Sequence, residues 1–107
     1  MYVELLGGDS GNLGSPRLYK TDRGTYAGQG WATGDPRRVE IPHRLLRYVE
    51  PGTCLIGLQD TGLGTFLLAG TPITDPEALG IMKIPSHEAA VEVPIGREVT
   101  PDAIVQP

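Results

Sequence analysis

Cysteine and histidine are scarce in this chain of 107 residues, which contains one cysteine, Cys54, and two histidines, His43 and His87. A single cysteine cannot form an intramolecular disulfide, and this one lies in a short apolar run over residues 53–56. We expect Cys54 to be a small core residue of a cytoplasmic protein. Neither histidine has a second ligand at helical or CxxC-type spacing, so we expect no metal site and no cofactor.

The chain also lacks a long apolar run, a secretory signal and a strongly basic field. No apolar stretch approaches the roughly 20 residues that a membrane span needs, and the first six residues show no signal-peptide pattern. Residues 1–50 carry seven Lys/Arg against six Asp/Glu, and residues 51–107 carry two against seven, which gives net charges of +1 and −5. Phosphate binding needs a basic field, so we expect neither nucleic acid nor a membrane as partner.

Two glycine-rich patterns resemble catalytic or nucleotide motifs but lack the context that those motifs require. Residues 8–11 read Gly-Asp-Ser-Gly, as around the nucleophile of chymotrypsin-like proteases, which need a His and an Asp ahead of the serine. Four glycines over residues 7–14 suggest a phosphate loop, but a strand is expected after Ser15-Pro16 where a helix is needed. A Cys54–histidine pair would need an open cleft. We therefore predict that the chain is not an enzyme.

Glycine and proline, by contrast, are abundant, with fifteen and ten residues. This punctuation is too dense for long helices, and short apolar runs between the Gly/Pro clusters are typical of strands joined by tight turns. We predict one mainly β (α+β) domain over residues 1–107, with a partly disordered tail at 96–107. The expected strands cover residues 2–6, 17–21, 25–32, 39–41, 54–59, 65–70 and 89–93; helices are expected over 42–49 and from an N-cap at Thr74 to Met82.

A hairpin in the second half repeats the first at an offset of forty residues. Residues 20–36 placed over 60–76 give six identities, which are turn glycines, strand-opening threonines and an Asp-Pro pair: Thr21/Thr61, Gly24/Gly64, Thr25/Thr65, Gly30/Gly70, Asp35/Asp75 and Pro36/Pro76. A looser match sets Val-Glu-Ile-Pro at 39–42 against Val-Glu-Val-Pro at 91–94. Such residues fix backbone geometry. We predict two related β-hairpin units packed as one small sheet or partly open barrel with one or two short helices, although two hairpins with like turns can also arise independently.

The residues best suited to contact a partner lie in the first hairpin and in the helix expected after it. Alternation along residues 25–32 places Gln29 and the sole tryptophan, Trp31, on one face, where Trp31 is either an interface anchor or core filling. Five basic or histidine side chains fall within residues 37–47, as a site for an acidic partner segment or as a solvated surface. The candidate partner-binding residues are Arg23, Gln29, Trp31, Arg44 and Arg47.

The segment 15–26, Ser-Pro-Arg-Leu-Tyr-Lys-Thr-Asp-Arg-Gly-Thr-Tyr, followed by Gln29-Gly30-Trp31 and Asp35-Pro36, resembles a group of small uncharacterised actinobacterial proteins. These share a Leu-Tyr-x-Thr-Asp-Arg-Gly-Thr-Tyr core and a late Ile-Pro…Glu…Val-Glu-Val-Pro segment, here at residues 84–94, and are often encoded beside helix-turn-helix regulators. Ala27-Gly28 departs from the β-branched residues expected in that hairpin. The resemblance implies an accessory regulatory role and supplies no functional residues.

These observations favour a non-enzymatic protein-interaction or accessory regulatory module, acting as a homodimer or as the partner of a transcription regulator. The alternative is a small-ligand-binding β-barrel with its mouth near the glycine-rich loop. That alternative predicts a cavity of a few hundred Å³ lined by Tyr19, Tyr26 or Trp31.

Overall fold

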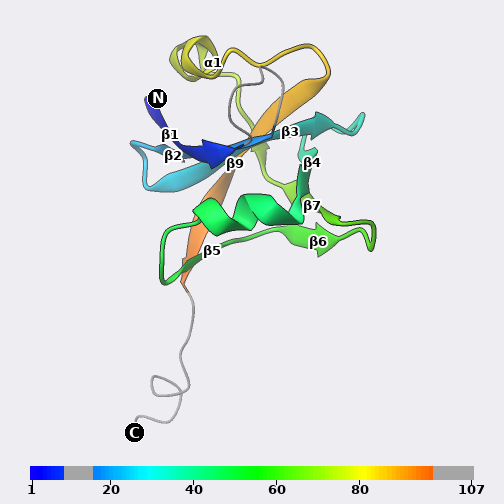
Figure 1. Ribbon diagram of the computed structural model, residues 1–107. Coiled ribbons are helices and arrows are strands. Elements are labelled where there is room, and N and C mark those ends of the chain that lie inside the picture. Colours follow the sequence, from blue (N-terminus) through cyan, green and yellow to red (C-terminus); the bar gives the residue numbers. More distant parts are fainter. Residues whose placement is uncertain (9–15, 98–107) are drawn as a thin grey trace, which may run out of the picture.

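The computed structural model describes residues 1–8 and 16–97, and Figure 1 shows how they are arranged. Within these ranges, nine strands join one antiparallel sheet that stays open and does not close into a barrel. The mainly β fold class is therefore confirmed, in its sheet form. The elements in chain order are β1 (Val3–Gly8), β2 (Arg17–Thr21), β3 (Thr25–Ala32), β4 (Arg38–Pro42), the 3-10 helix η1 (His43–Tyr48), β5 (Thr53–Leu55), β6 (Leu58–Asp60), β7 (Thr65–Ala69), β8 (Thr71–Pro72), α1 (Pro76–Met82) and β9 (Glu88–Arg97).

The two predicted hairpins, β2–β3 and β6–β7, turn on the same local chemistry. In the first, the Thr21 hydroxyl accepts the Arg23 N–H, and Gly24 takes a φ of +73°. In the second, Thr61 accepts the N–H of the residue two positions on, and Gly64 takes a φ of +86°. A left-handed backbone of this kind favours glycine, which is why both turns carry one at the same place.

Each hairpin pairs with the Val-Glu-x-Pro strand of the other copy. β3 runs antiparallel to β9 with residues 25–28 opposite residues 94–91, and β7 runs antiparallel to β4 with residues 65–68 opposite residues 42–39. The two registers coincide when residues 25–28 are matched to 65–68 at the forty-residue offset and residues 91–94 are matched to 39–42. The looser match between the two Val-Glu-x-Pro segments thus corresponds to equivalent strands, and the two related units form one sheet by exchanging these strands.

Two polar contacts repeat the same relation at the level of single atoms. The Thr25 hydroxyl donates to Glu92 Oε2 at 2.6 Å, and the Thr65 hydroxyl donates to Glu40 Oε2 at 2.7 Å. In each case the first residue of a hairpin's second strand is tied to the glutamate of the exchanged strand. The two threonines and the two glutamates therefore hold equivalent positions in the two units.

Gly30 and Gly70 mark the equivalent places where two backbones come closest. A Cβ on Gly30 would overlap the carbonyl oxygen of Glu40, and a Cβ on Gly70 would overlap that of Glu92. Because the obstacle is backbone in both cases, no rotamer change can relieve it. The repeated glycines are thus required by the packing of the two units.

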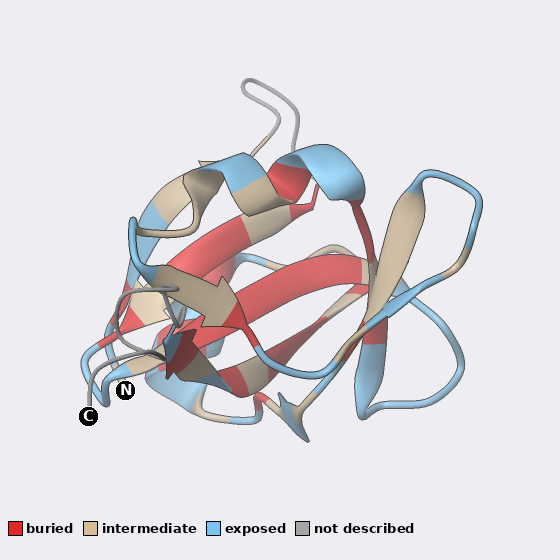
Figure 2. Cartoon of the chain, turned by 90° about the horizontal axis from the view of Figure 1, so that it is seen from below, coloured by how far each residue is buried: buried red, intermediate tan, exposed pale blue. Residues whose placement is uncertain are grey.

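The sheet is covered on both faces, by η1 on one and α1 on the other (Figure 1). Alternation along β2 and β3 sends Leu18 and Tyr26 to the η1 face and Tyr19 and Ala27 to the α1 face. Leu45 of η1 completes the first core. Figure 2 shows that the buried residues lie along the central strands. Two small cores therefore share one sheet.

Several expected element boundaries are wrong in detail. The run 54–59 is two strands because Gly57, with φ +95°, breaks it. The expected helix over 42–49 is a shorter 3-10 helix, since β4 continues through Pro42. The N-cap of α1 is Asp75 and not Thr74, because the Asp75 carboxylate accepts the Ala78 N–H. The last strand is β9, which reaches Arg97; residues 9–15 and 98–107, with the serine motif and most of the expected tail, lie outside the described residues.

Candidate functional site

The least usual side chains of the sheet are a buried glutamine and a buried glutamate on its α1 face. Gln29 of β3 is 1% exposed and Glu88 at the start of β9 is 6% exposed. Gln29 lies opposite the small Ala90, so its side chain extends along the strand to the diagonal neighbour Glu88. The Gln29 Nε2 donates to Glu88 Oε1 at 2.8 Å.

One oxygen of each side chain is buried without a hydrogen-bond partner in the structure, namely Gln29 Oε1 and Glu88 Oε2. Native structures satisfy nearly all buried polar atoms, so a pair of unsatisfied acceptors in one contact needs a reason. The His87 Nε2 approaches Glu88 Oε2 to 3.5 Å, outside ordinary hydrogen-bond length, and the His87 side chain is 61% exposed. The pair accordingly retains acceptor capacity that the adjacent sheet leaves unused.

Glu88 also lines a groove of about 400 Å³ between α1 and the sheet. We call this the Glu88 groove. Its walls are mainly apolar and come from residues 72–90, with one residue from the first half of the chain: Pro36, Pro72, Ile73, Leu79, Ile84, Pro85, Ser86, Glu88, Ala89 and Ala90. A concave apolar surface with a few converging polar atoms is the usual form of a binding site.

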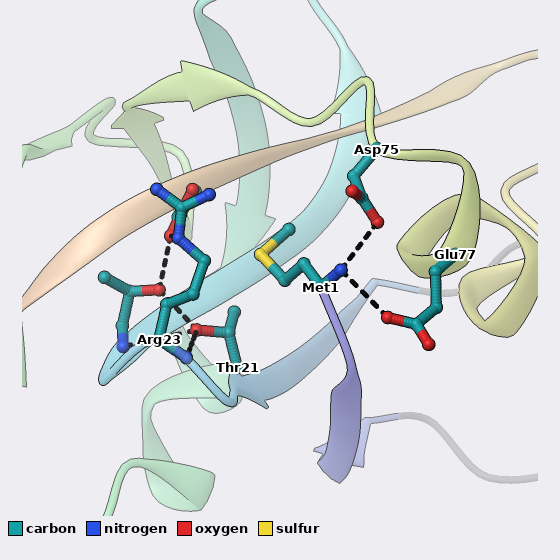
Figure 3. Close-up of polar contacts among 7 residues, drawn as sticks. Met1, Thr21, Arg23, Asp75 and Glu77 are labelled. Carbon is teal, nitrogen blue, oxygen red and sulfur yellow. Dashed lines mark hydrogen bonds and ion pairs between the residues drawn. The ribbon is translucent and has the colours of Figure 1, made fainter.

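Helix α1, which forms one wall of the groove, is anchored at its first turn (Figure 3). The Met1 ammonium lies 3.0 Å from Asp75 Oδ2 and 2.8 Å from Glu77 Oε1. The Ala78 N–H, together with the Met1 ammonium, lowers the pKa of the Asp75 carboxyl. The Glu77 and Asp75 carboxylates raise the pKa of the Met1 amine. These contacts tie the start of α1 to the beginning of β1.

Two of the five predicted partner-binding residues, Gln29 and Trp31, are neighbours of Glu88, although neither of them lines the groove. Gln29 is a buried residue and not a surface contact, and its Oε1 accepts no hydrogen bond in the structure. Trp31 lies directly opposite Glu88 in the β3–β9 register, and it is half-buried. Trp31 is therefore neither core filling nor fully exposed, and it stands beside the acceptor pair.

The other three predicted residues lie elsewhere. Arg23 is on the β2–β3 turn, at the far end of β3, with its Nε 3.5 Å from Glu92 Oε2 (Figure 3). Arg44 and Arg47 are exposed on η1, three residues apart and so on one side of a 3-10 helix. Because η1 covers the opposite face of the sheet, these arginines form no common surface with Gln29 and Trp31.

The other residues discussed in the sequence analysis lie in the two cores or in contacts away from the Glu88 groove. Cys54 lines a small apolar cavity of about 130 Å³ with Leu46, Val49, Thr53, Leu55 and Leu58. The His43 Nε2 lies 3.2 Å from Asp60 Oδ1 and 3.1 Å from the Thr65 carbonyl. The tyrosines expected to line a ligand cavity, Tyr19 and Tyr26, are core residues. In the two described ranges, no three His, Cys, Asp or Glu side chains gather as a metal site, and no helix is long and apolar enough to cross a membrane.

Sequence reasoning missed Glu88, which carries the site. Its local context, Ser-His-Glu-Ala-Ala, is typical of an exposed turn and gives no sign of burial. Comparison with protein-family models, with curated proteins and with solved structures gave no match to this chain.

Proposed function

We propose that the chain is a non-enzymatic protein-interaction module of the cytoplasm and that the Glu88 groove binds a short apolar segment of another protein. The observation that carries the proposal is the combination, in one groove, of apolar walls and the buried carboxyl group of Glu88, whose Oε2 accepts no hydrogen bond in the structure. The free thiol of Cys54 agrees with a reducing compartment. An accessory regulatory role beside a transcription regulator follows from the resemblance alone, and the groove does not depend on it.

The apolar surface of α1 supports this reading. Leu79, a wall residue of the groove, is 36% exposed, and Ile81 on the same helix is 39% exposed. A short helix that keeps large aliphatic side chains in water beside a groove offers the kind of surface that interaction sites use. The segment that fits such a groove needs only a few apolar side chains.

Peptide display tests the proposal. Random peptides on phage are selected against the wild type, Leu79→Glu and Leu63→Glu. L79E places a charge on the groove wall, whereas L63E places one at a side chain that is 85% exposed on the β6–β7 turn, outside the groove. We expect peptides enriched on the wild type to bind L63E equally well and to bind L79E at least tenfold more weakly. Enrichment that L79E leaves intact would show that the groove is not the site.

A second candidate is a small ligand in the same groove, because about 400 Å³ falls within the range of small-molecule sites. The β-barrel form of this alternative is wrong, since the sheet is open and Tyr19 and Tyr26 are packed in the cores. Selection of no peptide by a folded wild type, together with binding of small amines, would favour this candidate over a protein partner.

A further inference from the structure

The outer edge of the second hairpin is a place where the two related units differ. In the first unit, β1 pairs with the outer side of β2. In the second unit, β6 holds the position of β2, and β7 is its only partner strand among the described residues. We infer that a second copy of the chain binds at this edge, so that two β6 strands pair antiparallel about a twofold axis. Residues 56–63, which form this contact, do not line the Glu88 groove, so the interface goes beyond the proposed function and does not depend on it.

Strand β6 is equivalent to β2 by register as well as by sequence. Residues 18–20 of β2 lie opposite residues 28–26 of β3, and residues 58–60 of β6 lie opposite residues 68–66 of β7, which is the same register at the forty-residue offset. The segment forty residues after β1 is η1, which lies over a face of the sheet and not along its edge (Figure 1). Within the described ranges, the second unit therefore has no strand in the place that β1 takes in the first.

The backbone of β6 has hydrogen-bonding groups on its outer side. The Thr61 N–H donates to the Thr65 carbonyl of the facing strand at 3.1 Å. Hydrogen-bonded and non-hydrogen-bonded pairs alternate along an antiparallel ladder, so the N–H and C=O groups of Leu58 and Asp60 point away from β7. An edge with such groups is a template for a further strand.

This edge is complementary to itself. When two β6 strands run antiparallel with Gln59 opposite Gln59 of the second copy, Leu58 of each copy falls opposite Asp60 of the other. The outward backbone groups of these residues then exchange hydrogen bonds in two equivalent pairs. The two exposed Gln59 side chains meet on the axis, where a carboxamide can both donate to and accept from its own kind. The register keeps the two Asp60 carboxylates from facing each other, and each has the His43 Nε2 at 3.2 Å.

The same alignment accounts for two exposed aliphatic side chains that flank β6. Ile56 precedes the strand and is 47% exposed, and Leu63 on the hairpin turn is 85% exposed. Counting outwards from the Gln59 pair places residue 62 of one copy opposite residue 56 of the other, so Leu63 comes level with Ile56 of the second copy. Removal of these side chains from water adds apolar contact on both sides of the axis.

The other edge of the sheet is less suited to pairing with a copy of itself. The register of β1 with β2 shifts by one residue between Leu5 and Gly7, as in a β-bulge. Bulges are among the features that protect sheet edges from further pairing. A twofold contact through β6 therefore closes as a dimer and does not extend into a fibre.

Charge complementation at Gln59 tests the inference. Gln59→Lys and Gln59→Glu each place like charges opposite each other in the dimer, whereas an equimolar mixture of the two variants places opposite charges there. Leu5→Lys is the matched control, because it adds the same charge as Q59K to a side chain that is 53% exposed on the other edge strand.

Sedimentation velocity of each protein over concentrations from about 10 µM to about 1 mM spans the dissociation constants of small interfaces, and a melting curve of each variant checks that it is folded. We expect the wild type to dimerise within this range. The dissociation constant should rise about fivefold or more for Q59K alone and for Q59E alone, should return to the wild-type value or below in the mixture, and should not change for L5K.

A wild type that stays monomeric at about 1 mM would overturn the inference. Loss of the dimer in L5K but not in Q59K would also overturn it, because the dimer would then form through β1. A mixture that does not recover the affinity would exclude the antiparallel register centred on Gln59. The proposed function is tested separately, by peptide binding to L79E, so the two can fail independently.

Discussion

Replacement of Glu88 by glutamine should stabilise the folded protein. In the wild type, Glu88 Oε2 and Gln29 Oε1 are two buried oxygens that accept no hydrogen bond, and the His87 Nε2 lies 3.5 Å from Glu88 Oε2. The glutamine amide places an NH₂ where Glu88 has one of its oxygens, so that the two carboxamides can bond reciprocally, and it also removes a buried charge. An unsatisfied buried group costs about 1–3 kcal/mol, and more when it is charged. We therefore expect E88Q to raise the free energy of unfolding by about 1–2 kcal/mol.

For a domain of this size, 1 kcal/mol corresponds to a shift in melting temperature of about 4–8 °C, so the expected rise for E88Q is roughly 5–15 °C. Urea unfolding followed by circular dichroism gives the free energy, and a constant m-value shows that the transition is comparable. The control is E92Q, which weakens a carboxylate that already has the Thr25 hydroxyl as its donor and should lose up to about 1 kcal/mol. A destabilisation of E88Q equal to that of E92Q would refute the reasoning, because it would show that Glu88 Oε2 already has a stabilising hydrogen bond.

Three further predictions test the groove, the repeat and the anchor of α1. Because Trp31 is only half-buried, Trp31→Ala should lower the free energy of unfolding in urea by about 1–2 kcal/mol, less than the loss of about 3–5 kcal/mol for a core tryptophan. The same substitution should lower peptide affinity at least fivefold. Complete unfolding of the variant would instead make Trp31 a core residue. Gly30→Ala and Gly70→Ala should each lose about 3 kcal/mol through overlap with a carbonyl, whereas Gly80→Ala, with open space on α1, should gain about 0.5–1 kcal/mol; equal losses at all three would contradict the packing argument. The pKa of Asp75 is lowered, so the stabilisation that its carboxylate gives is present above the ordinary pKa of 3.8 and is lost as the pH falls through the folded-state pKa. The pKa of the Met1 amine is raised, so the stabilisation that its ammonium gives is full below pH 8.0 and is lost as the pH rises through the folded-state pKa. Asp75→Asn should flatten both limbs of the melting temperature plotted against pH, and an unchanged profile would exclude this anchor.

The parts of the fold that are determined by short-range geometry were predictable from the sequence. Gly24 and Gly64 mark the two hairpin turns because the left-handed backbone at each requires glycine. The alternation along β3 correctly placed Gln29 with Trp31 on one face, since side chains in a strand alternate regardless of what the strand pairs with. The forty-residue match identified the related units because the matching residues are the ones that fix local backbone geometry.

Pairing over long sequence separations was not predictable. Nothing in the local pattern says that the first hairpin pairs with residues 91–94 of the second copy, so the exchanged strands came only from the structure. Gln29 and Glu88 are 59 positions apart, and their contact depends on that exchange. Glu88 was therefore missed, and Gln29 was assigned to a partner surface when its side chain is buried.

The most direct test of the central claim is the affinity of one selected peptide for three forms of the protein. A peptide selected on the wild type is titrated calorimetrically into the wild type, L79E and L63E. The account predicts at least a tenfold loss of affinity in L79E, where the charge stands on the groove wall, and no loss in L63E. Equal affinities for the wild type and L79E would contradict it.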